Sequence, residues 1–135
     1  MQDLVQEMLA NSKIIAVVGL SSKINRPSHG VAAYMQAQGY RIIPVNPREA
    51  GRQILGELCY PDLIQAAQQH RIDLVDCFRN AEDIPPIVDE AIAIGATYLW
   101  MQSGIKNQIA AEQAQKAGIK VVMDKCIKIE HRMRY

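Results

Sequence analysis

The sequence has 135 residues, of which 49% are hydrophobic and 21% charged, and its formal net charge is +1. These values are typical of a soluble globular protein and predict one domain over residues 1–135. The near-neutral charge, the single Trp and the single Phe argue against nucleic-acid binding. No apolar run is long enough to predict a membrane span.

The first predicted elements are a helix over residues 3–10 and a strand over 13–19. In the first segment, apolar residues recur at helical spacing: Leu4, Val5, Met8 and Leu9. The second segment contains an unbroken β-rich apolar run from Ile14 to Val18. Such a run is typical of a strand that is buried on both faces of a parallel sheet.

The loop after this strand, residues 19–28, has the composition of an anion site. It supplies a glycine for close backbone approach, two hydroxyls and two positive charges: Gly19, Ser21, Ser22, Lys23 and Arg26. A helix predicted over 27–38 would add its N-terminal amides, and Pro27 suits its first turn. The pattern indicates either a phosphate site or an ordinary strand–turn–helix connection with solvated charges.

A second strand is predicted over residues 40–45. Pro44 lacks the amide that a central strand would donate, so we expect this strand to end early. The following loop, 44–48, is stiffened by two prolines, and residues 50–57 are expected to form turns around two glycines.

The next predicted elements are a helix over 62–70, with Asp62 as its N-cap, and a third strand over 73–78. Arg79 lies just past the end of this strand. Residues 80–83 are expected to cap a further helix, which carries two prolines in its first turn and stops at Gly95.

The fourth strand is predicted over 96–101, with the loop 102–104 at its C-terminal end. A helix from Asn107 to Ala117 and a fifth strand over 119–123 follow. The remaining segment, 124–135, is predicted to form a short helix.

Strands and helices therefore alternate five times with short connections, which predicts an α/β fold with a doubly wound five-stranded parallel sheet flanked by helices. We predict the strand order 3-2-1-4-5, with a switch point between strands 1 and 4. Ligand-binding residues are expected in the loops at the carboxyl ends of the strands.

Two common nucleotide-binding motifs are absent. The dinucleotide fingerprint Gly-x-Gly-x-x-Gly keeps only Gly19, because the next glycine, Gly30, is too far along the chain. The second strand is followed by Asn46, Pro47 and Arg48 rather than by the acidic residue that binds the ribose of NAD. Since Arg48 would favour a phosphorylated ribose, an NAD(P)-binding module stays open as an alternative. No Walker A loop occurs.

Six segments follow one another in a specific order: Gly19-Leu20-Ser21-Ser22, Arg26-Pro27-Ser28, Gly39 to Pro47, Asp76-Cys77-Phe78-Arg79, Trp100 to Gly104 and Val122 to Cys126. In this order and spacing they resemble the stand-alone CoA-binding domain proteins, over nearly the whole chain. That family is similar to the N-terminal CoA-binding domain of the succinyl-CoA synthetase α subunit. The resemblance implies a Rossmann-like fold with coenzyme A bound over the carboxyl ends of the strands.

The resemblance also implies which positions hold coenzyme A. The loop after strand 1 would bind its phosphates, and the loop after strand 2 its adenosine phosphate, with Arg48 replacing a Lys of the synthetase-like domains. The loops after strands 3 and 4 would add contacts, although the third loop matches loosely. The implied binding residues are Gly19, Ser21, Ser22, Arg26, Ser28, Val45, Asn46, Pro47, Arg48, Phe78, Arg79, Gln102 and Gly104.

The synthetase requires a further domain with a phosphorylated His, and no His of this sequence matches that position. Ligase activity is therefore not implied, and we expect a small non-catalytic module that binds coenzyme A or an acyl-CoA. The alternative is a single-domain enzyme that acts on a CoA thioester through Cys126, which lies near the end of strand 5. A half-buried structural role of this thiol is the other interpretation.

The cysteines, Cys59, Cys77 and Cys126, are odd in number and widely spaced. This predicts reduced thiols in a cytoplasmic protein, without disulfides or a metal site. The N-terminal segment has Asp3 and Glu7 and lacks the pattern of a signal peptide. A homo-oligomer stays open, because apolar positions on the outer helices cannot be divided into core and interface.

Overall fold

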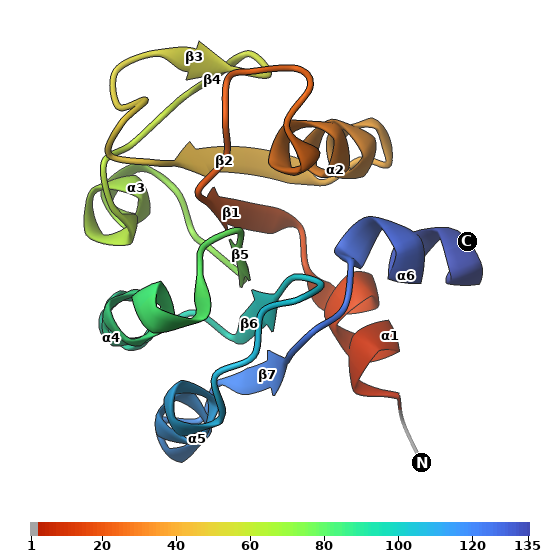
Figure 1. The fold of residues 1–135 in the computed structure, drawn as a ribbon, viewed down its shortest axis with the longest axis vertical. Helices are drawn as coiled ribbons and strands as arrows, with labels where there is room; N and C mark the ends of the chain where they lie inside the picture. Colours follow the sequence, from red (N-terminus) through yellow and green to blue (C-terminus); the bar gives the residue numbers. More distant parts are fainter. Residues whose placement is uncertain (1–2) are drawn as a thin grey trace.

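The computed structural model describes residues 3–135 and shows a parallel sheet between two layers of helices (Figure 1). The five strands of the sheet are β1 (Ile14–Val18), β2 (Arg41–Val45), β5 (Leu74–Cys77), β6 (Tyr98–Met101) and β7 (Lys120–Val122). Every neighbouring pair is parallel. The structure confirms the predicted fold class, a doubly wound, Rossmann-like α/β sheet flanked by helices.

Three helices cover each face of the sheet (Figure 1). One layer contains α1 (Leu4–Asn11), α2 (Pro27–Ala37) and α6 (Ile127–Arg134), and the other contains α3 (Leu63–Gln69), α4 (Ile84–Ala93) and α5 (Gln108–Lys116). Within β1, Ile15 and Val17 pack against the first layer, whereas Ala16 and Val18 pack against the second. Because alternate residues enter two different apolar cores, the strand reads as an unbroken apolar run.

The strand order is β2-β1-β5-β6-β7, and the predicted order 3-2-1-4-5 is wrong. The third strand of the sheet, β5, lies beside β1 instead of outside β2. Pro44 explains why, because its carbonyl faces outward and accepts the amide of Tyr60 at 3.0 Å. A strand outside β2 would need an amide donor at this position, which proline lacks. The switch point therefore lies between β1 and β5, not between β1 and β6.

Residues 50–57, expected to form turns only, contain most of a small hairpin. Its antiparallel strands are β3 (Gln53–Ile54) and β4 (Glu57–Leu58), and the residues between them, Leu55 and Gly56, both have positive φ angles. Two such residues form the tight turn whose twist suits a hairpin. The sequence has Leu where this turn usually has Asn or Asp, and the hairpin was therefore missed.

The predicted helix starts are largely confirmed. The carboxylates of Asp3 and Asp62 accept the amides of Val5 and Gln65, as N-cap residues do. Asn107 caps α5 in the same way. Residues 81–83 form a 3-10 turn ahead of α4, and the terminal segment forms α6. No helix within residues 3–135 is long and apolar enough to cross a membrane.

Candidate functional site

The loops after β1 and β5 diverge at the switch point: the first loop leads to α2 on one face of the sheet, and the second leads to α4 on the other face. Gly19 ends β1 with a φ of +92°, and its amide donates to the carbonyl of Val45 at 2.8 Å. A Cβ at this position would lie 2.4 Å from the carbonyl oxygen of Phe78. Only glycine therefore allows the two loops to come this close, at the place where doubly wound sheets bind ligands.

An open cleft of about 490 Å³ lies between these loops. We call it the basic cleft, because its charged lining residues are Lys23, Arg26, Arg48, Arg79 and a single acid, Glu49. The rest of the lining consists of Gly19, Ser21, Pro27, Ser28, Asn46 and Phe78. Four cationic side chains around one cleft favour an anionic ligand, and the guanidinium groups suit phosphate oxygens in particular.

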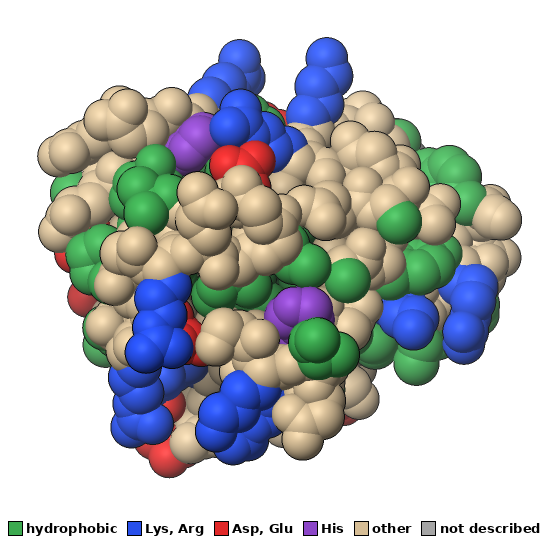
Figure 2. Space-filling model, turned by 90° about the horizontal axis from the view of Figure 1, so that it is seen from above, with side chains coloured by type: hydrophobic (Ala, Val, Ile, Leu, Met, Phe, Trp, Pro, Cys, Tyr) green, Lys and Arg blue, Asp and Glu red, His purple; other side chains and the backbone are tan. Residues whose placement is uncertain are grey.

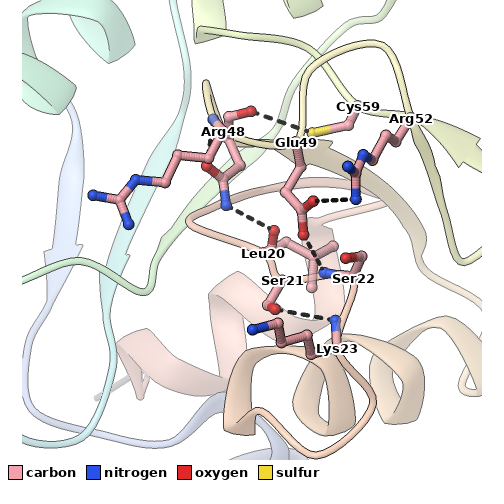
Figure 3. Close-up of polar contacts among 9 residues, drawn as sticks. Leu20, Ser21, Ser22, Lys23, Arg48, Glu49, Arg52 and Cys59 are labelled. Atoms are coloured by element: carbon pink, nitrogen blue, oxygen red, sulfur yellow. Dashed lines mark hydrogen bonds and ion pairs between the residues drawn. The ribbon is translucent and has the colours of Figure 1, made fainter.

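The loops after β1 and β2 are held together by Asn46, which is 8% exposed. Its Nδ2 donates to the carbonyl of Leu20 at 3.1 Å, and its Oδ1 accepts the amide of Arg48 at 3.0 Å. Its own carbonyl accepts a weak hydrogen bond from the thiol of Cys59. In Figure 3 dashed lines mark the ends of these contacts at Leu20 and Cys59. Asn46 therefore orders the backbone of two cleft-lining loops.

The amides of the loop after β1 already bond to protein side chains. Ser21 N donates to Ser28 Oγ at 3.1 Å, and Lys23 N donates to Ser21 Oγ at 3.1 Å. Between them, Ser22 N donates to Glu49 Oε2 at 2.7 Å. No side chain caps the start of α2, where Arg26 is the N-cap residue. Ser21 and Lys23, which line the cleft, and the N-terminal end of α2 therefore form one donor-rich edge. The Ser22 amide between them points to Glu49, which also lines the cleft.

Two smaller cavities adjoin the basic cleft, and Arg79 lines all three. The first, the acidic pocket, has about 270 Å³. Its wall combines valines and prolines of the β1, β2 and α3 ends with four carboxylates: Asp62, Glu82, Asp83 and Glu90. One of them, Asp83, pairs with the Arg79 guanidinium at 3.4 Å, so part of the positive charge of Arg79 is compensated.

The second, the Cys126 pocket, has about 320 Å³ and shares Pro27, Phe78 and Arg79 with the basic cleft. Its remaining lining is Val31, Asn80, Gln102, Ser103, Ile105 and Cys126. Cys126 stands at the N-cap position of α6 and is half-buried. This pocket is therefore a mostly uncharged continuation of the cleft toward a thiol.

The structure brings most of the predicted binding residues together. The basic cleft contains Gly19, Ser21, Arg26, Ser28, Asn46, Arg48, Phe78 and Arg79. Val45 and Pro47 line the acidic pocket, and Gln102 lines the Cys126 pocket. Two predicted residues, Ser22 and Gly104, line none of the three cavities, and their amides donate to Glu49 and to Asp124.

Glu49 is the cleft residue that the sequence analysis missed. An acidic residue was sought directly after the second strand, and Glu49 lies four positions past Val45, the last residue of β2. The β2–β3 loop folds back and brings it to Ser22. Its position in the sequence carries no signal for this contact, because the path of the loop depends on tertiary hydrogen bonds such as Asn46 N to the Tyr60 carbonyl.

The cysteines are free thiols in the structure. Burial raises the pKa of Cys59 to about 11 and raises the pKa of Cys77 well above its usual value, so both thiols stay protonated at neutral pH. His131, the His nearest to Cys126 in the sequence, bonds to Tyr34 and lines a different cavity. Within residues 3–135, no cluster of three or more His, Cys, Asp and Glu side chains could hold a metal ion.

On the face seen in Figure 2, which looks down on the molecule from above the view of Figure 1, Lys and Arg side chains occur in several separate places, some of them beside Asp or Glu side chains.

The sequence matches the family described as the CoA binding domain over residues 13–132, and the chain belongs to this family. The uncharacterized protein YneT of Bacillus subtilis is 39% identical over 127 residues, which cover 94% of this chain and 91% of YneT. The structure of cell-free ID.343 from Thermus thermophilus has 34% identity and a TM-score of 0.93, with both chains covered completely.

A larger protein shares the fold. The dinucleotide forming acetyl-coenzyme A synthetase 1 of Ca. Korarchaeum cryptofilum has a TM-score of 0.74 and 22% identity. The match covers 89% of this chain and 27% of the synthetase. At this identity the likeness concerns the architecture of one part of the synthetase.

Proposed function

We propose that this member of the CoA binding domain family binds coenzyme A at the carboxyl edge of its sheet, as a module without catalysis of its own. The observation that carries the proposal is the meeting of three chemically different cavities at Arg79. Coenzyme A likewise has three chemically different parts: a set of phosphates, an adenine and an uncharged pantetheine arm that ends in a thiol.

The phosphates fit the basic cleft. Arg26 and Arg48 approach it from the loops after β1 and β2, and Lys23 adds a third charge. Gly19 brings the loop after β5 close to the cleft, and Ser28 lies at the start of α2, whose N-terminal end favours negative charge. Arg48 follows β2 and would hold the phosphate on the ribose.

The other two parts fit the neighbouring pockets. Adenine is flat and apolar with an exocyclic amine, which suits the acidic pocket with its prolines and its carboxylate acceptors. The pantetheine arm suits the Cys126 pocket, whose lining includes Val31, Phe78 and Ile105 together with the amide of Gln102 as a polar contact. The thiol or acyl end would then lie near Cys126. Free coenzyme A and acyl-CoA differ only at this end.

A thiol nucleophile is activated by a neighbouring base, and the nearest His in the sequence, His131, bonds to Tyr34 instead. This favours binding over thioester chemistry. Glu49 lies in the loop after β2 and lines the basic cleft, where its carboxylate could accept hydrogen bonds from ribose hydroxyls. This observation keeps an NAD(P) ligand as the second candidate. The two candidate functions can be distinguished by measuring whether the protein binds coenzyme A or NADP.

Calorimetric titration of coenzyme A tests the proposal, with dephospho-CoA and NADP as comparison ligands. Arg26→Ala should weaken coenzyme A binding about tenfold to a hundredfold, because a charge-assisted contact contributes roughly 1.5–3 kcal/mol. Arg71→Ala is the matched control. Arg71 is 89% exposed and precedes β5, so it lies at the amino-terminal ends of the strands, away from the cleft. Binding of NADP without coenzyme A, or equal loss in both variants, would contradict the proposal.

A further inference from the structure

Glu49 is the one acid among the residues that line the basic cleft. Its side chain is 13% exposed and lies between the Ser22 amide, at 2.7 Å from Oε2, and Arg52 Nη1, at 3.4 Å from Oε1 (Figure 3). Hydrogen bonds from Ser22, together with the charges of Arg52 and Lys23, outweigh burial and hold the pKa of Glu49 below its usual value. The carboxylate is therefore ionised at neutral pH.

The acceptor on the Ser22 amide differs from those on its neighbours. The amides of Ser21 and Lys23 donate to serine hydroxyls, which are neutral and can rotate. The amide of Ser22 instead donates to a charged oxygen. A carboxylate oxygen and a phosphate oxygen are both anionic acceptors, and both form short, strong bonds with backbone amides. A phosphate that approaches this part of the loop meets an amide already engaged with an acceptor of its own kind.

The surroundings allow an exchange. Lys23 follows Ser22 in the chain and lines the cleft, and Arg48 precedes Glu49 and also lines it, so both loops carry positive charge that attracts a phosphate to the cleft. Arg52 is 70% exposed and holds the second oxygen of Glu49 from the solvent side. A displaced carboxylate can keep its partner by moving outward with this flexible side chain, so it is not left buried and unpaired.

We propose that Glu49 determines the charge selectivity of the cleft by competing with a ligand phosphate for the Ser22 amide. This inference rests on the proposed function. A ligand phosphate must replace the carboxylate and overcome its repulsion, so Glu49 weakens the binding of every ligand that places a phosphate there. A ligand without phosphate leaves the contact intact. The residue thus sets a minimum of negative charge that a ligand needs in order to bind well.

Calorimetric titrations with coenzyme A, inorganic pyrophosphate and pantetheine test this competition in wild type, Glu49→Ala and Glu49→Gln. Glu49→Ala should bind the two phosphate ligands about tenfold more tightly, since one charge-assisted contact no longer has to be displaced. Glu49→Gln keeps a hydrogen-bond acceptor without the charge, so its affinity for the phosphate ligands should lie between those of wild type and Glu49→Ala. Pantetheine binding should not change. Glu112→Ala, the same charge change on the exposed face of α5, is the control and should match wild type.

The amide resonance of Ser22 gives a readout that does not depend on coenzyme A. In wild type, pyrophosphate should shift this resonance more than it shifts the neighbouring amides, and the shift should saturate at lower concentration in Glu49→Ala. Weaker phosphate binding in Glu49→Ala with wild-type binding in Glu49→Gln would mean that Glu49 only orders the loop, and would overturn the inference. Unchanged affinities in both variants would also overturn it.

The two proposals fail in different ways. If coenzyme A binds wild type and Glu49→Ala equally, the competition is wrong and the proposed function stands. If pyrophosphate binds at Ser22 with the expected difference but coenzyme A does not bind, the function is wrong and the competition stands. If no phosphate ligand binds, both are wrong.

Discussion

Gln102, just past β6, donates a hydrogen bond from Nε2 to Oδ1 of Asp76 on β5 across 2.6 Å. Its Oε1 accepts the amide of Ile127 at 3.3 Å, so Gln102 joins two strands to the start of α6. Asp76 is only 2% exposed. Its burial outweighs the hydrogen bond from Gln102 and raises its pKa to about 7.

Asp76 should make the fold less stable as the pH rises from about 4 to about 7. Its ordinary pKa of 3.8 applies to the unfolded chain, so in this window the folded protein binds more protons than the unfolded chain. The loss of stability is complete above pH 7 and amounts to roughly 4 kcal/mol at most. Asp76→Asn removes the ionisation and keeps the shape.

The measurement is urea denaturation of wild type and Asp76→Asn at several pH values. The free energies of unfolding should be similar near pH 4, and the variant should become the more stable protein above pH 7. A constant difference between the two proteins across this range would show that Asp76 is not protonated in the fold.

Gly19→Ala should destabilise the protein and disturb the cleft. The new Cβ would meet the Phe78 carbonyl oxygen at 2.4 Å, in a backbone conformation with φ of +92°. The conformation alone costs about 1–3 kcal/mol for residues other than glycine, and the clash adds to it. Gly30→Ala is the control, because Gly30 lies in α2 with nothing within 4 Å. It should stabilise the helix by about 0.5–1 kcal/mol. Thermal melts of both variants test the pair, and equal melting temperatures would contradict the prediction.

Ser12→Ala should make the protein more stable. Ser12 Oγ is buried and finds no hydrogen-bond partner among residues 3–135, and Ser12 itself is 5% exposed. Removing such a hydroxyl relieves a desolvation penalty of about 1–3 kcal/mol. Ser28→Ala is the opposite case, since Ser28 is equally buried but its Oγ accepts the Ser21 amide. Denaturant titrations should move the two midpoints in opposite directions, and a loss of stability in Ser12→Ala would refute the argument.

Arg48→Ala should reduce the preference for coenzyme A over dephospho-CoA. The two ligands differ by the phosphate on the ribose, which the proposed orientation places near the loop after β2. The dissociation constant of dephospho-CoA divided by that of coenzyme A should fall about tenfold or more in the variant. The affinity for dephospho-CoA itself should change little. An equal loss for both ligands would place Arg48 at the diphosphate instead. Calorimetry with both ligands distinguishes these outcomes.

The sequence predicted the elements of this fold well because the strands are apolar on both faces and the helices have side-chain caps or glycine stops. Asp62 and Asn107, for example, cap helices at the predicted places. The order of the strands could not be predicted from apolar runs, since each run fits any position in the sheet. Pro44 was the one residue that distinguished the alternatives, because its missing amide marks β2 as an edge strand.

The candidate site was predicted in part for a related reason. In a parallel sheet, the loops after the strands meet at one edge whatever the order, so Arg26, Arg48 and Arg79 are brought together. Glu49 and the engagement of Ser22 were not predictable. They depend on how the long connection after β2 folds back, which local sequence does not determine.

Both edges of the sheet carry features that disfavour pairing with further strands. At the β2 edge, Tyr60 forms a bridge to Val45, and Pro44 offers no donor. At the other edge, β7 has only three residues, and Lys120 pairs with Glu7 of α1. Exposed strand edges are the usual starting points of aggregation. A folded molecule of this protein therefore offers little template for strand pairing between chains as long as its edge residues keep these contacts.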